Sequence, residues 1–75
     1  MSATINNMDF KLVDILMVDQ LEVDDFIDID GQIVQVVNVT SAGDTWLITF
    51  LDEYDEKDFI EVNDDAKFDL YVLVD

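Results

Sequence analysis

The dipeptide Asp30-Gly31 is the feature that most constrains how this chain can fold. It separates residues 26–29 from residues 32–40, two segments rich in isoleucine and valine. A two-residue type I′ turn needs a positive φ at both central positions, and Asp-Gly tolerates this. The dipeptide therefore predicts a β-hairpin. Proline is absent and the only other glycine is Gly43, so we expect a second hairpin turn over residues 41–44.

Further strands are indicated by β-branched and aromatic runs with period-2 alternation. Val34 and Val36 share one face of their strand while Val37 and Val39 share the other, and a β-bulge near 36–37 would turn all four inward. Aspartates spaced five residues apart near the N-terminus do not form one helical face, which favours a strand there. The strands expected beside the first hairpin are 10–15, 45–51, 59–62 and 67–75, with an irregular link over 17–21 and a loop over 52–58.

Five to six short antiparallel strands in 75 residues predict one all-β domain over residues 1–75, with residues 1–8 flexible. A chain of this length buries only about 60% of the surface that its unfolded form exposes, so the core is thin. A small barrel or a tight sandwich fits, because closing a sheet removes the edges through which strand proteins aggregate.

The stretch LEVDDFIDIDGQIVQV, from Leu21 to Val36, resembles the opening "L-x-V-G-D-x-I-x-x-x-G-x-x-x-x-V" of SH3-like barrels of the KOW and translation-elongation-factor-P type. The strand layout of residues 10–75 is similar to theirs and to that of many small bacteriophage proteins. The resemblance implies a small SH3-like barrel. Asp24 stands where those domains usually have glycine, so it must accept a left-handed conformation or the turn must be built differently.

Charge is the outlying property of the composition, with 19 acidic residues against three lysines and a formal net charge of −16. Such a field repels nucleic acid and anionic membranes, so we expect neither as a direct ligand. The basic loops with which ribosome-associated barrels contact RNA have no counterpart here. The same field attracts basic proteins, and a basic protein is the partner that we expect.

Cysteine and histidine are both absent, which excludes disulfides, thiol nucleophiles and imidazole catalysis. A barrel this small is filled by its own side chains, so we expect no enzyme and no cofactor. The acids of residues 52–58 offer oxygen ligands of the kind that Ca²⁺ takes, but a solvated loop is the favoured interpretation, so we expect no metal site. The longest apolar run is 15–18, too short to cross a membrane, and no basic signal region opens the chain. We expect a cytoplasmic protein, in the host cytoplasm if it is viral.

Two alternatives remain for the acidic residues. Carboxylates two apart on a strand lie about 6.6 Å apart, so an array beginning with Asp28 and Asp30 could imitate the phosphates of a nucleic acid and bind a nucleic-acid-binding protein. The other alternative is a solvated surface that only keeps the chain soluble. The residues predicted to bind a partner are Asp28, Asp30, Asp52, Glu53, Asp55, Glu56 and Asp58.

Apolar residues suggest a structural or assembly protein as a different function. If Trp46, Ile48 and Phe50 face inward, then Leu47 and Leu51 face outward, as does Leu73 beside Tyr71. A joined apolar patch would be a partner or dimer interface, with the charge serving solubility alone. The oligomeric state predicted is a monomer or a weak homodimer.

Overall fold

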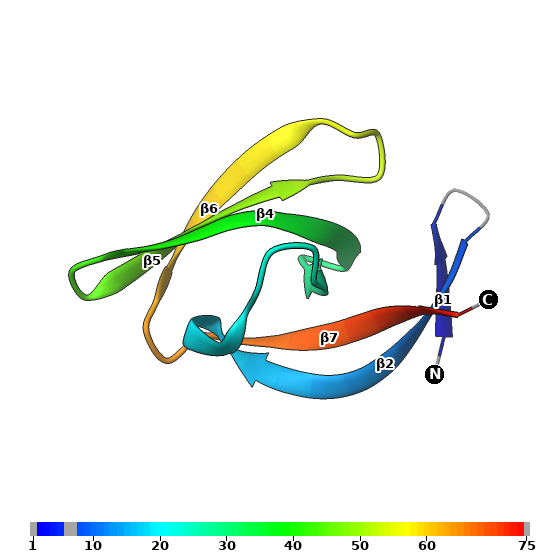
Figure 1. Cartoon of the computed structure of the whole chain (residues 1–75), viewed down its shortest axis with the longest axis horizontal. Helices are drawn as coiled ribbons and strands as arrows, with labels where there is room; N and C mark the ends of the chain where they lie inside the picture. The colour runs from blue at the N-terminus through cyan, green and yellow to red at the C-terminus, as the bar shows by residue number, and fades with distance from the viewer. Residues whose placement is uncertain (1, 6–7, 75) are drawn as a thin grey trace.

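The computed structural model describes residues 2–5 and 8–74, with side chains from Asp9 to Val74 (Figure 1). The described residues form one antiparallel sheet with the strand order β1-β2-β7-β3-β4-β5-β6 and a single 3-10 turn, η1 (Val18–Gln20). The strands are β1 (Ser2–Ile5), β2 (Met8–Met17), β3 (Phe26–Ile29), β4 (Gln32–Ala42), β5 (Thr45–Leu51), β6 (Lys57–Asn63) and β7 (Lys67–Val74).

The all-β antiparallel class is confirmed, and the predicted strands correspond to β2 through β7. The sheet is not closed into a barrel by hydrogen bonds, because β1 and β6 are its two opposite ends in the strand order. The predicted closure is therefore not found. The predicted flexibility of residues 1–8 stays a prediction: residues 1, 6 and 7 lie outside the described residues, and the backbone of Ser2–Ile5 pairs with β2.

The sheet rolls into two layers, with β4, β5 and β6 in one and β2 and β7 in the other (Figure 1). Strand β3 joins the layers, because it pairs with β4 on one side and with β7 on the other. The core fills the space between the two layers, so its residues from different layers meet because the sheet is rolled. Its buried members are Val18, Leu21, Ile27, Val34, Val36, Ile48 and Phe50.

The bulge predicted in β4 is present. The register with β5 shifts between Val36 and Asn38, which leaves Val37 as the extra residue. Val36 is fully buried and Val39 packs against the core, while Val37 is only half-buried outside the core cluster. The bulge therefore keeps both ends of β4 facing the core, although it does not bring all four valines inward.

Of the two alternatives expected for Asp24, the structure has the left-handed conformation, with φ at 77°. Its N–H donates to the Val36 carbonyl at 2.8 Å, and the Val36 N–H donates to the Asp25 carbonyl at 2.8 Å. The Gln35 side-chain amide donates to Asp24 Oδ1 at 3.1 Å. These bonds attach the segment before β3 to β4 beside the bulge.

A second, smaller apolar cluster lies on the other side of the sheet. Phe10 and Ile33 are buried but do not belong to the main core, and the rings of Phe10 and Phe26 lie 4.8 Å apart between centroids. Phe26 is paired with Tyr71, while its neighbour Ile27 is paired with Leu70 and faces the core. Strands β3 and β7 therefore bury side chains on both faces. The alternation predicted for the last strand holds for Phe68 and Leu70 only, since Val72 and Val74 extend past the core and are exposed.

Candidate interaction surfaces

The acidic segment 52–58 forms the loop between β5 and β6 and the start of β6. Asp52 organises the loop: its Oδ1 accepts the N–H groups of Tyr54 at 2.8 Å and Glu56 at 3.0 Å. Its own N–H donates to the Glu56 carbonyl, and its carbonyl accepts the Asp55 N–H, both at 3.0 Å. One carboxylate therefore shapes the loop that presents the others.

The remaining carboxylates of this segment differ in their surroundings. Asp55 is exposed in the left-handed region with φ at 59°, and Glu56 is exposed beside it. Glu53 is half-buried. Asp58 lies inside β6, where its Oδ1 accepts the N–H of Phe59 at 2.8 Å. Only part of the predicted set is thus directed freely into solvent.

Asp28 and Asp30 do not form the strand array expected of them. Asp30 lies in the turn after β3 and is exposed with φ at 53°, so the spacing of a strand does not apply to the pair. Asp28 is half-buried opposite Ile33, and its Oδ1 is buried without a hydrogen-bond partner. Asp30 is available to a partner, whereas Asp28 is largely covered. Their role in binding stays a prediction.

The topology brings Asp30 and the 52–56 loop to the same end of the sheet. Strands β3 and β5 both run antiparallel to β4, so the turn after β3 and the loop after β5 leave the sheet in the same direction. A second group of acids gathers at the opposite end, where the Val18 N–H donates to the Ala66 carbonyl and ties η1 to the β6–β7 turn. This second group, which the sequence reasoning did not single out, comprises Asp19, Asp44, Asp64 and Asp65.

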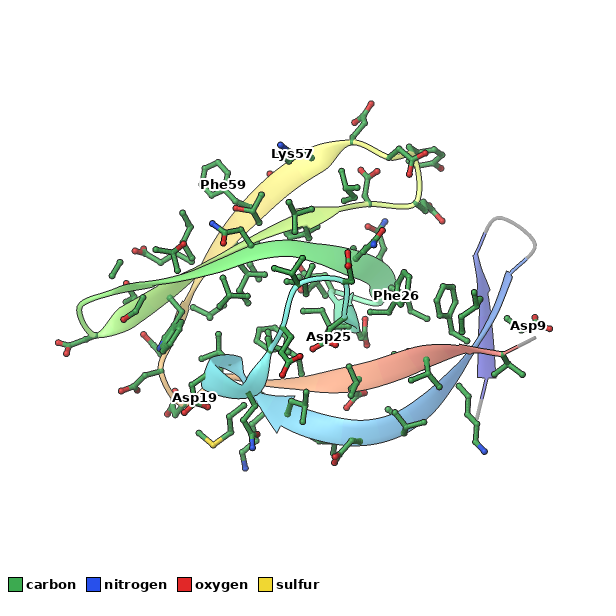
Figure 2. All side chains as sticks on the ribbon, viewed as in Figure 1. Asp9, Asp19, Asp25, Phe26, Lys57 and Phe59 are labelled. Carbon is green, nitrogen blue, oxygen red and sulfur yellow. The ribbon has the colours of Figure 1, made fainter. Side chains whose placement is uncertain are left out.

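Figure 2 shows Asp9 near one end of the long axis, Asp19 beside η1, and Lys57 and Phe59 projecting from β6 away from β2 and β7. Among the described residues most acids lie outside the strands, in turns and loops where backbone N–H groups without a ladder partner can donate to a short carboxylate.

The solvent side of β4, β5 and β6, here called the outer face, carries almost no acid. The strand register aligns the residues of this face in four rows across the three strands. Glu61 and Lys57 are the only charged residues in these rows. Phe59 is 63% exposed near its centre, with Leu47 exposed diagonally beside it. The rows are Gln35-Leu51-Lys57, Asn38-Thr49-Phe59, Thr40-Leu47-Glu61 and Ala42-Thr45-Asn63.

The predicted facing of β5 is confirmed: Ile48 and Phe50 are buried and Trp46 packs against the core, while Leu47 is exposed on the outer face. Leu51 is half-buried. Leu73 is exposed on β7 and so belongs to a different part of the surface. Leu47 and Leu51 therefore share the outer face, while Leu73 does not join them.

The described part of the chain has no pocket, and no three of its carboxylates are grouped closely enough to hold a metal ion together. No helix among the described residues is long and apolar enough to cross a membrane. What the structure offers is surface: acidic loops at two ends and a neutral outer face between them.

The molecule is thus an all-β protein of one antiparallel sheet with acidic loops. No protein-family model matches the chain, and neither the curated proteins nor the solved structures contain a match to it.

Proposed function

We propose that this chain is a non-enzymatic interaction module, a small phage-type accessory protein whose acidic loops bind a basic, nucleic-acid-binding protein in place of nucleic acid. It acts in the cytoplasm, in the host cytoplasm if the chain is viral. The observation that carries the proposal is that Asp30 and the 52–56 loop leave the sheet at the same end, with the loop held by Asp52.

Two physical arguments support this function. A net charge of −16 raises the rate at which a basic partner is encountered, and it disfavours anionic competitors. A loop that is fixed by its own hydrogen bonds loses less conformational entropy on binding than a mobile acidic tail would. Asp55 and Glu56, which are exposed in that loop, are the residues that we expect to contact the partner first.

The relation to SH3-like barrels belongs to the same proposal. Five strands are consecutive neighbours in the order β7-β3-β4-β5-β6, so β7 lies beside β3. That order, together with the bulge in the long strand β4, supports an SH3-like arrangement in a sheet that is rolled but open. Strands β1 and β2 extend the sheet beyond β7.

A second function is favoured by the outer face. Its neutrality and its exposed Phe59 suit a structural or assembly protein that binds through apolar and polar contacts, with the charge serving solubility alone. The two functions differ in their response to salt, since charge-driven binding weakens as salt is added and apolar binding does not.

The experiment is capture of binding proteins from a lysate on the immobilised chain at about 0.05 M and 0.5 M salt, followed by competition with double-stranded DNA. The proposal predicts a basic nucleic-acid-binding protein that is released by salt and displaced by DNA. A partner that stays bound at high salt and ignores DNA would refute the acidic-loop function and support the assembly function.

A further inference from the structure

Strand β6 is one end of the sheet. It pairs with β5 alone among the described strands, and its other edge is free over the seven residues of Lys57–Asn63. An unpaired edge presents backbone N–H and C=O groups that can extend the ladder with another strand. The chain contains no proline that would interrupt such pairing. The free edge therefore needs either a partner or a device that keeps partners away.

The outer row of β6 is self-complementary. Lys57, Phe59 and Glu61 point to the outer face in succession, with the aromatic residue midway between two opposite charges. In an antiparallel pair formed around a two-fold axis through Phe59, each Lys57 lies directly opposite Glu61 of the second copy, and the two Phe59 side chains face each other. We propose that two copies of this chain associate edge to edge through β6 in this register.

Neighbouring registers lack this match. A two-fold axis through Asp58 would place the two Asp58 carboxylates opposite each other, which is repulsive. An axis through Ile60 would place Phe59 opposite Glu61, and Lys57 opposite Asn63. Only the axis through Phe59 pairs both charges of the outer row, so the charges select one register as well as one partner.

The outer face makes such a dimer compatible with the charge of the chain. Lys57 and Glu61 are its only charged residues, so the two faces that would become continuous are neutral. Repulsion enters at the ends of the strand, because Asn63 of one copy lies opposite Asp55 of the other and the acidic loop approaches the acidic β6–β7 turn. Screening by salt removes this repulsion and leaves the backbone pairing, so association strengthens with salt.

Asp58 regulates access to the edge. Its Oδ1 accepts the Phe59 N–H at 2.8 Å, which identifies this amide as one that points to the free edge. The Phe59 amide is the group that would pair at the two-fold axis, so the carboxylate must leave before pairing occurs. Asp14 makes the equivalent bond to the Ile15 N–H on β2, where that strand extends past β1. The native dimer is accordingly weak, and removal of the Asp58 carboxylate strengthens it.

The proposal does not rest on the function assigned to the acidic loops. Binding of a basic partner weakens with salt, whereas this association grows with salt, so either can fail without the other. The residues also differ, since the dimer uses Lys57, Phe59 and Glu61 and the partner uses the loop carboxylates.

Sedimentation equilibrium of the full chain at about 0.1 M and 0.5 M salt tests the dimer with five proteins: the native chain, Lys57→Glu, Glu61→Lys, the double exchange Lys57→Glu/Glu61→Lys, and Asp58→Ala. Each single reversal replaces two attractive cross-strand pairs by two repulsive ones, so we expect dimerisation weakened about tenfold. The double exchange keeps the formal net charge of −16 and restores the pairs in reverse, so it should return the native constant. Asp58→Ala should dimerise more tightly than the native chain.

Glu61→Lys best separates specific pairing from general charge repulsion. It makes the chain less negative, so it would strengthen any association that is limited by net charge alone. Its loss of the Thr45 Oγ–Glu61 hydrogen bond is controlled by comparing thermal melts of all five proteins. Three results overturn the proposal: a monomer at millimolar concentration in both the native chain and Asp58→Ala, a dimer strengthened by Glu61→Lys, or a dimer that the double exchange does not restore.

Discussion

The β5–β6 loop and the outer face are joined through the same two strands, yet they differ in almost every physical property. The loop is acidic and its shape depends on a carboxylate, Asp52, that accepts backbone N–H groups. The outer face is neutral, and Phe59 lies on it with 63% of its surface exposed. Acids are thus placed where backbone N–H groups can use them, whereas the outer face carries a single acid, Glu61, and a single lysine, Lys57.

The largest change in stability is expected from substitutions on the two faces of β5. Ile48 is fully buried in the core, whereas Leu47 is exposed on the outer face. Ile48→Ala should lower the free energy of unfolding by about 2–5 kcal/mol, through lost burial and the cavity left behind. Leu47→Ala should change it by about 0.5 kcal/mol or less. Urea unfolding of the two variants measures both, and equal losses would mean that the outer face belongs to the folding core.

The loop can be tested by separating the hydrogen bonds of Asp52 from its charge. Asp52→Ala leaves the Tyr54 and Glu56 N–H groups without their acceptor and should cost about 1–2 kcal/mol. Asp52→Asn keeps an oxygen acceptor and should cost less than half as much. Urea unfolding compares the two variants. If the asparagine variant is as unstable as the alanine variant, the charge and not the acceptor holds the loop.

A smaller effect is expected at Asp24, where an acid takes a conformation that glycine adopts without strain. Asp24→Gly removes that strain together with the bond to Gln35, so its net effect on stability should be within about 0.5 kcal/mol of zero. Asp24→Ala keeps the strain, loses the bond and should cost about 1 kcal/mol. Thermal melts compare the stabilities of the two variants. An alanine variant as stable as the glycine variant would contradict the role given to the left-handed backbone.

The smallest expected effect is that of salt on the whole chain. Acids at both ends repel one another across a molecule with 19 carboxylates and three lysines. Raising salt from about 0.02 M to 0.3 M should raise the melting temperature by a few degrees, because the Debye length falls well below the spacing of the loops. Differential scanning calorimetry at a dilution that keeps the chain monomeric measures this. A melting temperature that falls with salt would contradict net repulsion as the dominant charge effect.

Local chemistry predicted the strands and turns well. The Asp30-Gly31 hairpin, strand 45–51 and the bulge after Val36 were readable because each depends on a few adjacent residues. Turns are predictable because they need residues that accept particular φ values. Strands are predictable because apolar and polar side chains alternate along them. The opening strand was also found, although it is longer than predicted.

Long-range pairing decided what the sequence could not show. The contact between Phe10 and Phe26 exists because β2 and β3 both flank β7, and no local pattern encodes that arrangement. Tertiary packing also buries the Oδ1 atom of Asp28, a carboxylate that the sequence analysis predicted to bind a partner. The outer face was missed for the same reason, since its neutrality appears only when the register aligns β4, β5 and β6.

In the proposed function, the acidic loops bind the partner and the neutral outer face does not. The most direct measurement is the affinity of the captured basic partner for two variants: a loop variant, Asp30→Asn/Asp55→Asn/Glu56→Gln, and an outer-face variant, Leu47→Thr/Phe59→Thr. We predict that the loop variant binds at least about tenfold more weakly and with a shallower salt dependence, while the outer-face variant binds like the native chain. A loop variant with native affinity, beside an outer-face variant that fails to bind, would contradict the account.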